Sequence, residues 1–200
     1  MKKIAIIILA AGASKRMKQP KQLLPWSNST LLEYIIANAN NIKRGDVFTV
    51  LGANAELITN TINIESTVLL HRKWEQGMGS SIAFGVSEIE KSQYDGVLII
   101  LADQPFVNTA YLNQLLDTFN QDKVNIVASR FHGNVGVPAI FSSEYFNDLK
   151  ALNRDYGAKD IIKNHFQDVK TIQADDLVID IDTIETYREI YDQEFGIDGK

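Results

Sequence analysis

The chain has 200 residues, of which 45% are hydrophobic and 22% charged, and its formal net charge is −5. This size and apolar content predict one globular domain over residues 1–200 and argue against a disordered or fibrous protein. The absence of cysteine excludes disulfides and thiolate metal sites and fits a reducing, cytoplasmic location, whereas the acidic balance argues against nucleic-acid binding.

Short runs rich in valine and isoleucine are predicted to be strands, in chain order at 4–9, 47–51, 68–70, 97–101, 126–128 and 178–181. Helical periodicity lies between them, for example over 31–39 and 112–119. Strands that are apolar throughout and alternate with helices predict a mostly parallel, Rossmann-like sheet in a three-layer α/β/α sandwich. The first apolar run, 4–11, is too short for a secretory segment or a membrane span, so we expect no membrane partner.

The stretch LAAGASKRMKQPKQLLPW, residues 9–26, follows the first predicted strand and carries Lys15, Arg16, Lys18 and Lys21. Ligands of such sheets bind beyond the carboxyl ends of the strands, and the small residues 10–14 let backbone N–H groups surround a phosphate. Arg16 offers a bidentate fork to a terminal phosphate, and Lys21 offers a mobile point charge. A solvated, lysine-rich surface loop is the alternative interpretation.

Two well-known phosphate loops are absent. The sequence contains no GxxxxGK[ST] motif, and no GxGxxG follows the first predicted strand. The loop is therefore neither a Walker A site nor a dinucleotide-binding fingerprint.

Carboxylates follow two later strands. Asp103 comes directly after 97–101, where a carboxylate needs a cation or backbone donors, and Mg²⁺ commonly takes one or two carboxylates together with phosphate oxygens. The alternative is that Asp103 has only a structural role in the turn that follows, at Gln104 and Pro105. Asp182 comes after 178–181 and also fits a capping box with Glu185. Asp180 lies two residues earlier, on the same side of an extended strand, and is the weaker candidate.

The segment GMGSSI, residues 77–82, precedes a helical pattern, and its small residues let a flat base approach. N-capping of that helix by Ser80 or Ser81 is the alternative. The three histidines are scattered, so we expect them to be structural or exposed and not a metal site.

The stretch LAAGASKRMKQPKQLLPW, residues 9–26, resembles the signature LAAGxSxRMGxPKxLL of the nucleotidyltransferases related to the molybdenum cofactor cytidylyltransferase. Further matches follow in order along the chain: WEQGMGSSI, LADQP, GNVGVPAIF, DYGAKDIIKNH and IDIDTIETY. The sequence departs from the family pattern at Lys18, where glycine is common, and at Val137, where many members have histidine in a GHP motif. The second departure bears on substrate recognition.

The resemblance implies a nucleotide-binding part over 1–110 and an acceptor-binding part over 111–200, with the acceptor side formed by 134–165. It also implies the site residues. They are the catalytic cations Arg16 and Lys21, the nucleotide contacts Leu9, Ala10, Ala11, Gly12, Gly79, Ser80, Ser81 and Asp103, and the Mg²⁺ ligands Asp103 and Asp182.

The reaction that we expect is the Mg²⁺-dependent transfer of CMP from CTP to the phosphate of molybdopterin or the molybdenum cofactor, with release of pyrophosphate. The motifs show no activated serine, cysteine or histidine nucleophile, which suits a reaction driven by positioning and charge neutralisation. The resemblance to the cytidylyl branch, with LAAG in place of LAGG, implies CTP and a molybdenum hydroxylase that receives the product. The alternatives are GTP, a sugar- or polyol-phosphate acceptor, or a non-catalytic nucleotide sensor or cofactor chaperone.

Overall fold

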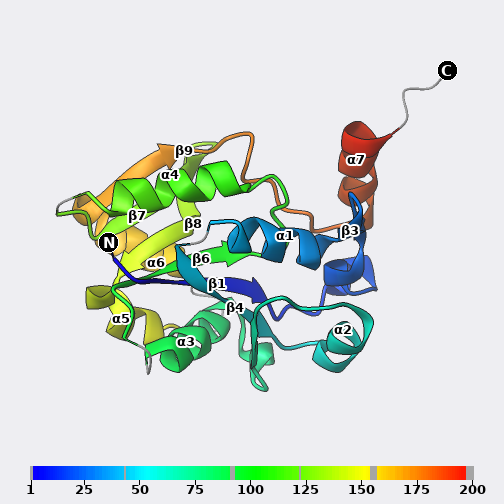
Figure 1. Ribbon diagram of the computed structural model, residues 1–200, viewed down its shortest axis with the longest axis horizontal. Helices are drawn as coiled ribbons and strands as arrows, with labels where there is room; N and C mark the ends of the chain where they lie inside the picture. The colour runs from blue at the N-terminus through cyan, green and yellow to red at the C-terminus, as the bar shows by residue number, and fades with distance from the viewer. Residues whose placement is uncertain (1, 43, 91–92, 122, 154–156, 197–200) are drawn as a thin grey trace.

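A seven-stranded sheet forms the centre of the computed structural model, which describes residues 2–42, 44–90, 93–121, 123–153 and 157–196 (Figure 1). Its strands are β1 (Ile4–Ala10), β4 (Gly45–Leu51), β5 (Thr67–Leu70), β6 (Gly96–Leu101), β7 (Ile126–Phe131), β8 (Asn134–Ser142) and β9 (Val169–Gln173). The spatial order is β5-β4-β1-β6-β8-β7-β9. The DY of DYGAKDIIKNH and all but the first residue of the tail 196–200 lie outside the described residues.

The sheet is mostly parallel, as the sequence predicts. β1 pairs in parallel with β4 and β6, β4 with β5, and β7 with β9, whereas β8 runs antiparallel to both β6 and β7. β1 is buried over its whole length, because helices cover both faces of the sheet.

The side chains on the two faces of β1 pack into two separate hydrophobic cores. Ile4, Ile6 and Ile8 pack with α1 (Leu31–Asn40), α2 (Ala55–Thr61) and α4 (Thr109–Phe119). Ala5, Ile7 and Leu9 pack with α3 (Met78–Ile89), α5 (Phe146–Lys150) and α6 (Ala158–Asn164) on the opposite face. The predicted α/β/α sandwich is therefore confirmed.

The remaining elements are short, except for the last helix. A hairpin of β2 (Pro25–Trp26) and β3 (Ser29–Thr30) ends the first loop, and α7 (Ile184–Phe195) ends the described chain. Single turns of 3₁₀ helix lie at Lys15–Met17, Lys21–Leu23, Trp74–Gln76, Ser143–Tyr145 and Phe166–Asp168. Among the described residues, no helix is both long and apolar enough to pass through a membrane.

The prediction of a strand at 178–181 is wrong. This segment is not part of the sheet, whose edge is formed instead by β9. The segment crosses the carboxyl end of β6, where the Ile181 N–H donates to the Asp103 carbonyl at 2.9 Å. Val178 and Ile181 are apolar because they are buried in the first core, and burial alone produced the strand-like pattern.

Trp26 fastens α7 to the first loop. It is 2% exposed and makes edge-on ring contacts with Phe106, Tyr191 and Phe195. The Tyr187 hydroxyl donates to the Pro25 carbonyl at 2.8 Å. The last helix therefore packs beside the β2-β3 hairpin, although the two are far apart in sequence (Figure 1).

Replacing Trp26 with alanine is expected to lower the free energy of unfolding by about 3–5 kcal/mol, because it removes the centre of this buried cluster. The measurement is equilibrium urea unfolding. Phe166→Ala is the control, since Phe166 is 54% exposed and its loss should change stability by no more than about 0.5 kcal/mol. Equal losses in the two variants would contradict the assigned role of Trp26.

Candidate active site

The larger cavity, of about 580 Å³, opens at the carboxyl ends of β1 and β6. Most of the predicted site residues line it, namely Leu9, Ala10, Ala11, Gly12, Arg16, Lys21, Ser81, Asp103 and Asp182. Trp74, Gly77 and Met78 form another part of the wall. The topology thus brings together residues from the first loop, α3, β6 and the segment before α7.

Gln22 holds the first loop in shape. Its side chain is buried, and its Nε2 atom donates to the carbonyls of Ala10 at 2.7 Å and Gly12 at 3.1 Å. A side chain added at Gly12 would meet nothing within 4 Å, so open space lies in front of the loop. Gln22 was not predicted as a site residue, because nothing in the stretch QLLPW shows that its side chain is buried against the loop.

The backbone explains the departure at Lys18. Its φ angle is 55°, in the left-handed region that favours glycine. The glycine of the family signature therefore suits the turn, and Lys18 adopts the same turn with an exposed side chain that lies outside the cavity wall.

Two cations and two carboxylates alternate across the cavity. The Lys21 ammonium donates to Asp103 Oδ2 at 2.5 Å and to Asp182 Oδ1 at 3.2 Å. Arg16 Nη2 donates to Asp182 Oδ2 at 2.8 Å. The structure therefore places all four charged site residues of the sequence analysis in one network.

Burial and charge act against each other in this network. Burial would lower the pKa of Lys21, but attraction and hydrogen bonds from Asp103 and Asp182 outweigh it, so the pKa lies above its ordinary value. Burial raises the pKa of Asp103, and Lys21 offsets this only in part. Burial would also raise the pKa of Asp182, but Lys21 and Arg16 outweigh it and lower that pKa.

Asp182 does not cap the last helix. The N-cap of α7 is Thr183, whose side chain accepts from the Thr186 N–H at 3.2 Å. The predicted capping box was out of register by one residue, and this leaves the Asp182 carboxylate available to the cations. Asp180 also lines the cavity, but its Oδ1 atom accepts from Gln104 Nε2 at 2.8 Å and not from either cation.

The carboxylate pair fits a divalent cation in a shared site. Among the described residues, no group of three or more histidine, cysteine, aspartate or glutamate side chains is placed to hold a metal by itself. Asp103 and Asp182 nevertheless meet at one ammonium, and Asp103 Oδ1 is buried without a hydrogen-bond partner. Two carboxylates suit Mg²⁺ when phosphate oxygens complete its shell.

Of the nucleotide contacts predicted in segment 77–82, only one lies at the cavity. The helix begins at Met78, so these residues lie within its first turn, and neither serine caps it, because the N-cap is Gly77. Ser81 lines the cavity, whereas Gly79 and Ser80 lie outside its wall. The Ser80 hydroxyl is 2.7 Å from Nε2 of the buried His71.

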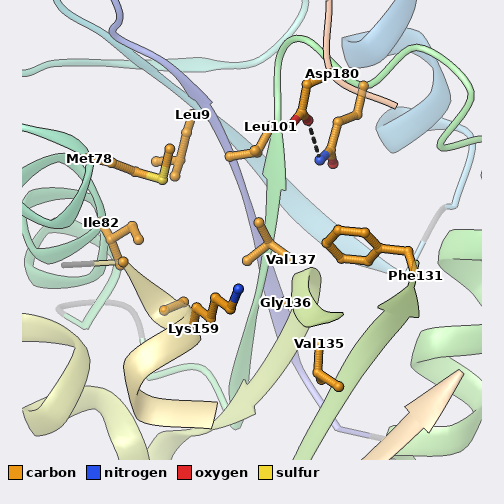
Figure 2. A pocket seen from close by; sticks show the side chains of 13 residues that line it. Leu9, Met78, Ile82, Leu101, Phe131, Val135, Gly136, Val137, Lys159 and Asp180 are labelled. Atoms are coloured by element: carbon orange, nitrogen blue, oxygen red, sulfur yellow. Dashed lines mark hydrogen bonds between the residues drawn. The ribbon is translucent and has the colours of Figure 1, made fainter. Parts of the chain in front are cut away.

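A smaller cavity of about 150 Å³ adjoins the larger one, and Leu9, Met78, Leu101 and Asp180 line both. Figure 2 shows its mainly apolar wall, with Phe131 and Val137 extending toward the same space from β7 and β8. Val137, the second departure from the family signature, thus contributes an apolar side chain to this wall. The dashed line in Figure 2 is the contact between Gln104 and Asp180.

A cavity at the carboxyl ends of a mostly parallel sheet, with lysine and arginine set against two aspartates, suits the binding of nucleotide phosphates, as in a nucleotidyltransferase. The chain belongs to the MobA-like NTP transferase domain family, whose sequence model matches residues 6–169. The resemblance found in the motifs is therefore confirmed.

Individual relatives carry varied names. The chain is 30% identical to the purine catabolism protein PucB of Bacillus subtilis (strain 168), over 79% of this chain and 80% of PucB. It is 32% identical to nicotine blue oxidoreductase of Paenarthrobacter nicotinovorans, over 61% of this chain and 60% of that protein. The crystal structure of Rv0371c from Mycobacterium tuberculosis H37Rv is similar with a TM-score of 0.84 and 27% identity, covering 94% of this chain and 97% of Rv0371c.

Acid should destabilise the protein in part through His71. Burial, and then Lys73, lower the pKa of His71 below its ordinary value of about 6.5, so the folded protein holds the ring neutral. Its contribution to stability is therefore present above that value and is lost as the pH falls through the lowered pKa.

The measurement is urea unfolding at pH 7.5 and at pH 5.5. Between these two pH values, the free energy of unfolding should fall less in His71→Gln than in the unaltered protein. The control is His132→Gln, because the His132 side chain is 65% exposed. A full acid-induced loss in His71→Gln would contradict the role of His71.

Proposed function

We propose that this nucleotidyltransferase moves CMP from CTP to the phosphate of molybdopterin or of the molybdenum cofactor. An oxygen of the acceptor phosphate forms a bond to the α-phosphorus, the bond from that phosphorus to the β-phosphate oxygen breaks, and pyrophosphate leaves. The cation–carboxylate network carries the proposal of nucleotidyl transfer. The choice of CTP and of the pterin acceptor is supported by the LAAG and DQP motifs, and we propose a molybdenum hydroxylase as the recipient of the product.

The chain supplies positive charge and needs no strong base, because the attacking phosphate is already anionic. Lys21, whose mostly buried side chain lines the cavity, stabilises charge that develops at the α-phosphate. Arg16, at the exposed side, holds the β- and γ-phosphates through its planar fork. Mg²⁺ held by Asp103 and Asp182 would neutralise triphosphate oxygens.

The two cavities support separate binding sites for the nucleotide and for the acceptor. The first loop and α3 contribute much of the larger cavity, to which we assign the nucleotide. β7, β8 and α6 contribute Phe131, Val137 and Lys159 to the smaller one, to which we assign the acceptor. The proposed parts 1–110 and 111–200 follow this division only in part. Asp180 and Asp182 border the larger cavity, and the smaller one is also lined by Leu9, Met78, Ile82, Leu101 and Gln104.

Lys21→Met is expected to reduce turnover about 10²- to 10³-fold, by analogy with the loss of one preorganised donor to a developing oxyanion. The assay is pyrophosphate release from CTP in the presence of Mg²⁺ and the pterin acceptor. Lys18→Met is the matched control, because Lys18 lies in the same loop but outside the cavity wall. Turnover of Lys21→Met within a few fold of the control would remove Lys21 from the reaction.

Nucleotide choice is tested by thermal unfolding with CTP, GTP, ATP and UTP, each with Mg²⁺ and with a chelator. A nucleotide at 100 times its dissociation constant should add roughly 2.7 kcal/mol, or several degrees in melting temperature. We expect a Mg²⁺-dependent rise with CTP alone.

A rise with GTP or UTP in place of CTP would contradict the cytidylyl assignment and leave the nucleotidyltransferase class intact. Asp103→Asn should abolish the difference between Mg²⁺ and chelator. If that difference persists in Asp103→Asn, Asp103 does not hold the metal.

A further inference from the structure

The Lys21 ammonium is surrounded by oxygen atoms of the kinds that also bind metal ions. Its three oxygen neighbours are Asp103 Oδ2 at 2.5 Å, Asp182 Oδ1 at 3.2 Å and the Ile181 carbonyl at 3.3 Å. Three acceptors match the three donors of an ammonium group. Carboxylate and carbonyl oxygens are also the ligands that hard divalent cations take. The same oxygens can therefore serve either cation.

Simultaneous occupation is unfavourable. Asp103 Oδ2 is engaged by Lys21, and the side chains of both residues are only 15% exposed, so solvent screens little charge between them. A divalent cation on these carboxylates would stand within a few ångströms of the ammonium and repel it. Only Asp103 Oδ1 is left without a hydrogen bond on this carboxylate.

We propose that Lys21 occupies the divalent-cation position in the nucleotide-free protein, so that the metal binds together with the triphosphate and not before it. The nucleotide is taken from the proposed function, whereas the exclusion of the metal concerns only Lys21 and its carboxylates. Triphosphate oxygens give Lys21 new anionic partners as it leaves Asp103 and Asp182. By thermodynamic linkage, the triphosphate and the metal then raise each other's affinity by the same factor.

Arg16 has a matching role at the other carboxylate. It pairs with Asp182 Oδ2 at 2.8 Å, and its side chain is far more exposed than that of Lys21. Arg16 can therefore leave Asp182 at low cost. The buried contact between Lys21 and Asp103 is the one that controls access of the metal.

A purely structural ion pair makes the opposite prediction. Removing the lysine from such a pair would weaken folding and give no gain in metal binding, because the buried carboxylate would become protonated. Metal affinity in the absence of nucleotide therefore separates the two roles, independently of turnover.

The test is a titration of the intact protein with Mn²⁺, followed by electron paramagnetic resonance of the free ion. Without nucleotide, the unaltered protein and Lys18→Met should bind Mn²⁺ weakly. Lys21→Met should bind Mn²⁺ at least about tenfold more tightly, within the usual range of coupling between two sites. Adding Asp103→Asn to Lys21→Met should remove the gain.

CTP provides the second readout. It should raise the Mn²⁺ affinity of the unaltered protein and raise that of Lys21→Met by a smaller factor. Lys21→Gln, which keeps a hydrogen-bond donor without the charge, repeats the test if Lys21→Met is poorly folded.

The proposal is overturned if removing the charge of Lys21 leaves Mn²⁺ affinity unchanged. It is also overturned if the unaltered protein binds Mn²⁺ as tightly without CTP as with it while CTP binds. A gain in Mn²⁺ affinity without any binding of CTP would support the exclusion by Lys21 and contradict the proposed nucleotide. If CTP binds but Lys21→Met gains no Mn²⁺ affinity, the result would support the proposed nucleotide and contradict the exclusion of the metal by Lys21.

Discussion

The contact between the Lys21 ammonium and the Asp103 carboxylate, at 2.5 Å, joins three parts of the chain that are distant in sequence. Lys21 comes from the loop after β1, Asp103 from the end of β6, and the Ile181 carbonyl from the segment before α7. Burial opposes the charge on each partner, and the opposite charge of the other partner acts against this effect on both pKa values. Under the proposed function, the shape of the nucleotide site depends on an ion pair that binding of the triphosphate would reorganise.

Much of the fold follows from the pattern of apolar residues. The wholly apolar run of β1 predicts a strand buried on both faces, and the helical periodicity of α1 and α4 predicts the covering layer. β8 and β9 escaped prediction for physical reasons. β8 contains a glycine and a proline, which weaken a strand signal, and β9 is a half-buried edge strand with polar residues. The run 178–181 misled because a buried crossing segment is as apolar as a strand.

The candidate site was predictable where one local motif contained its residues, as with Arg16 and Lys21, or where a carboxylate followed a strand, as with Asp103. Interactions that depend on tertiary contacts were not predictable. No local signal shows that Ser80 faces His71 or that Gln22 braces the first loop. The register of the cap on α7 was also missed, because Asp182 and Thr183 are both good N-cap residues.

The segment that carries Asp180 and Asp182 is synthesised well after the first loop, yet it borders the cavity built by that loop. While the chain is being synthesised, residues 1–110 have the lysine and the arginine but only one of the two carboxylates that pair with them. The proposed nucleotide site therefore has both carboxylates of its ion-pair network only after residue 182 has been synthesised. Separating the chain into its two proposed parts would give neither fragment a complete site.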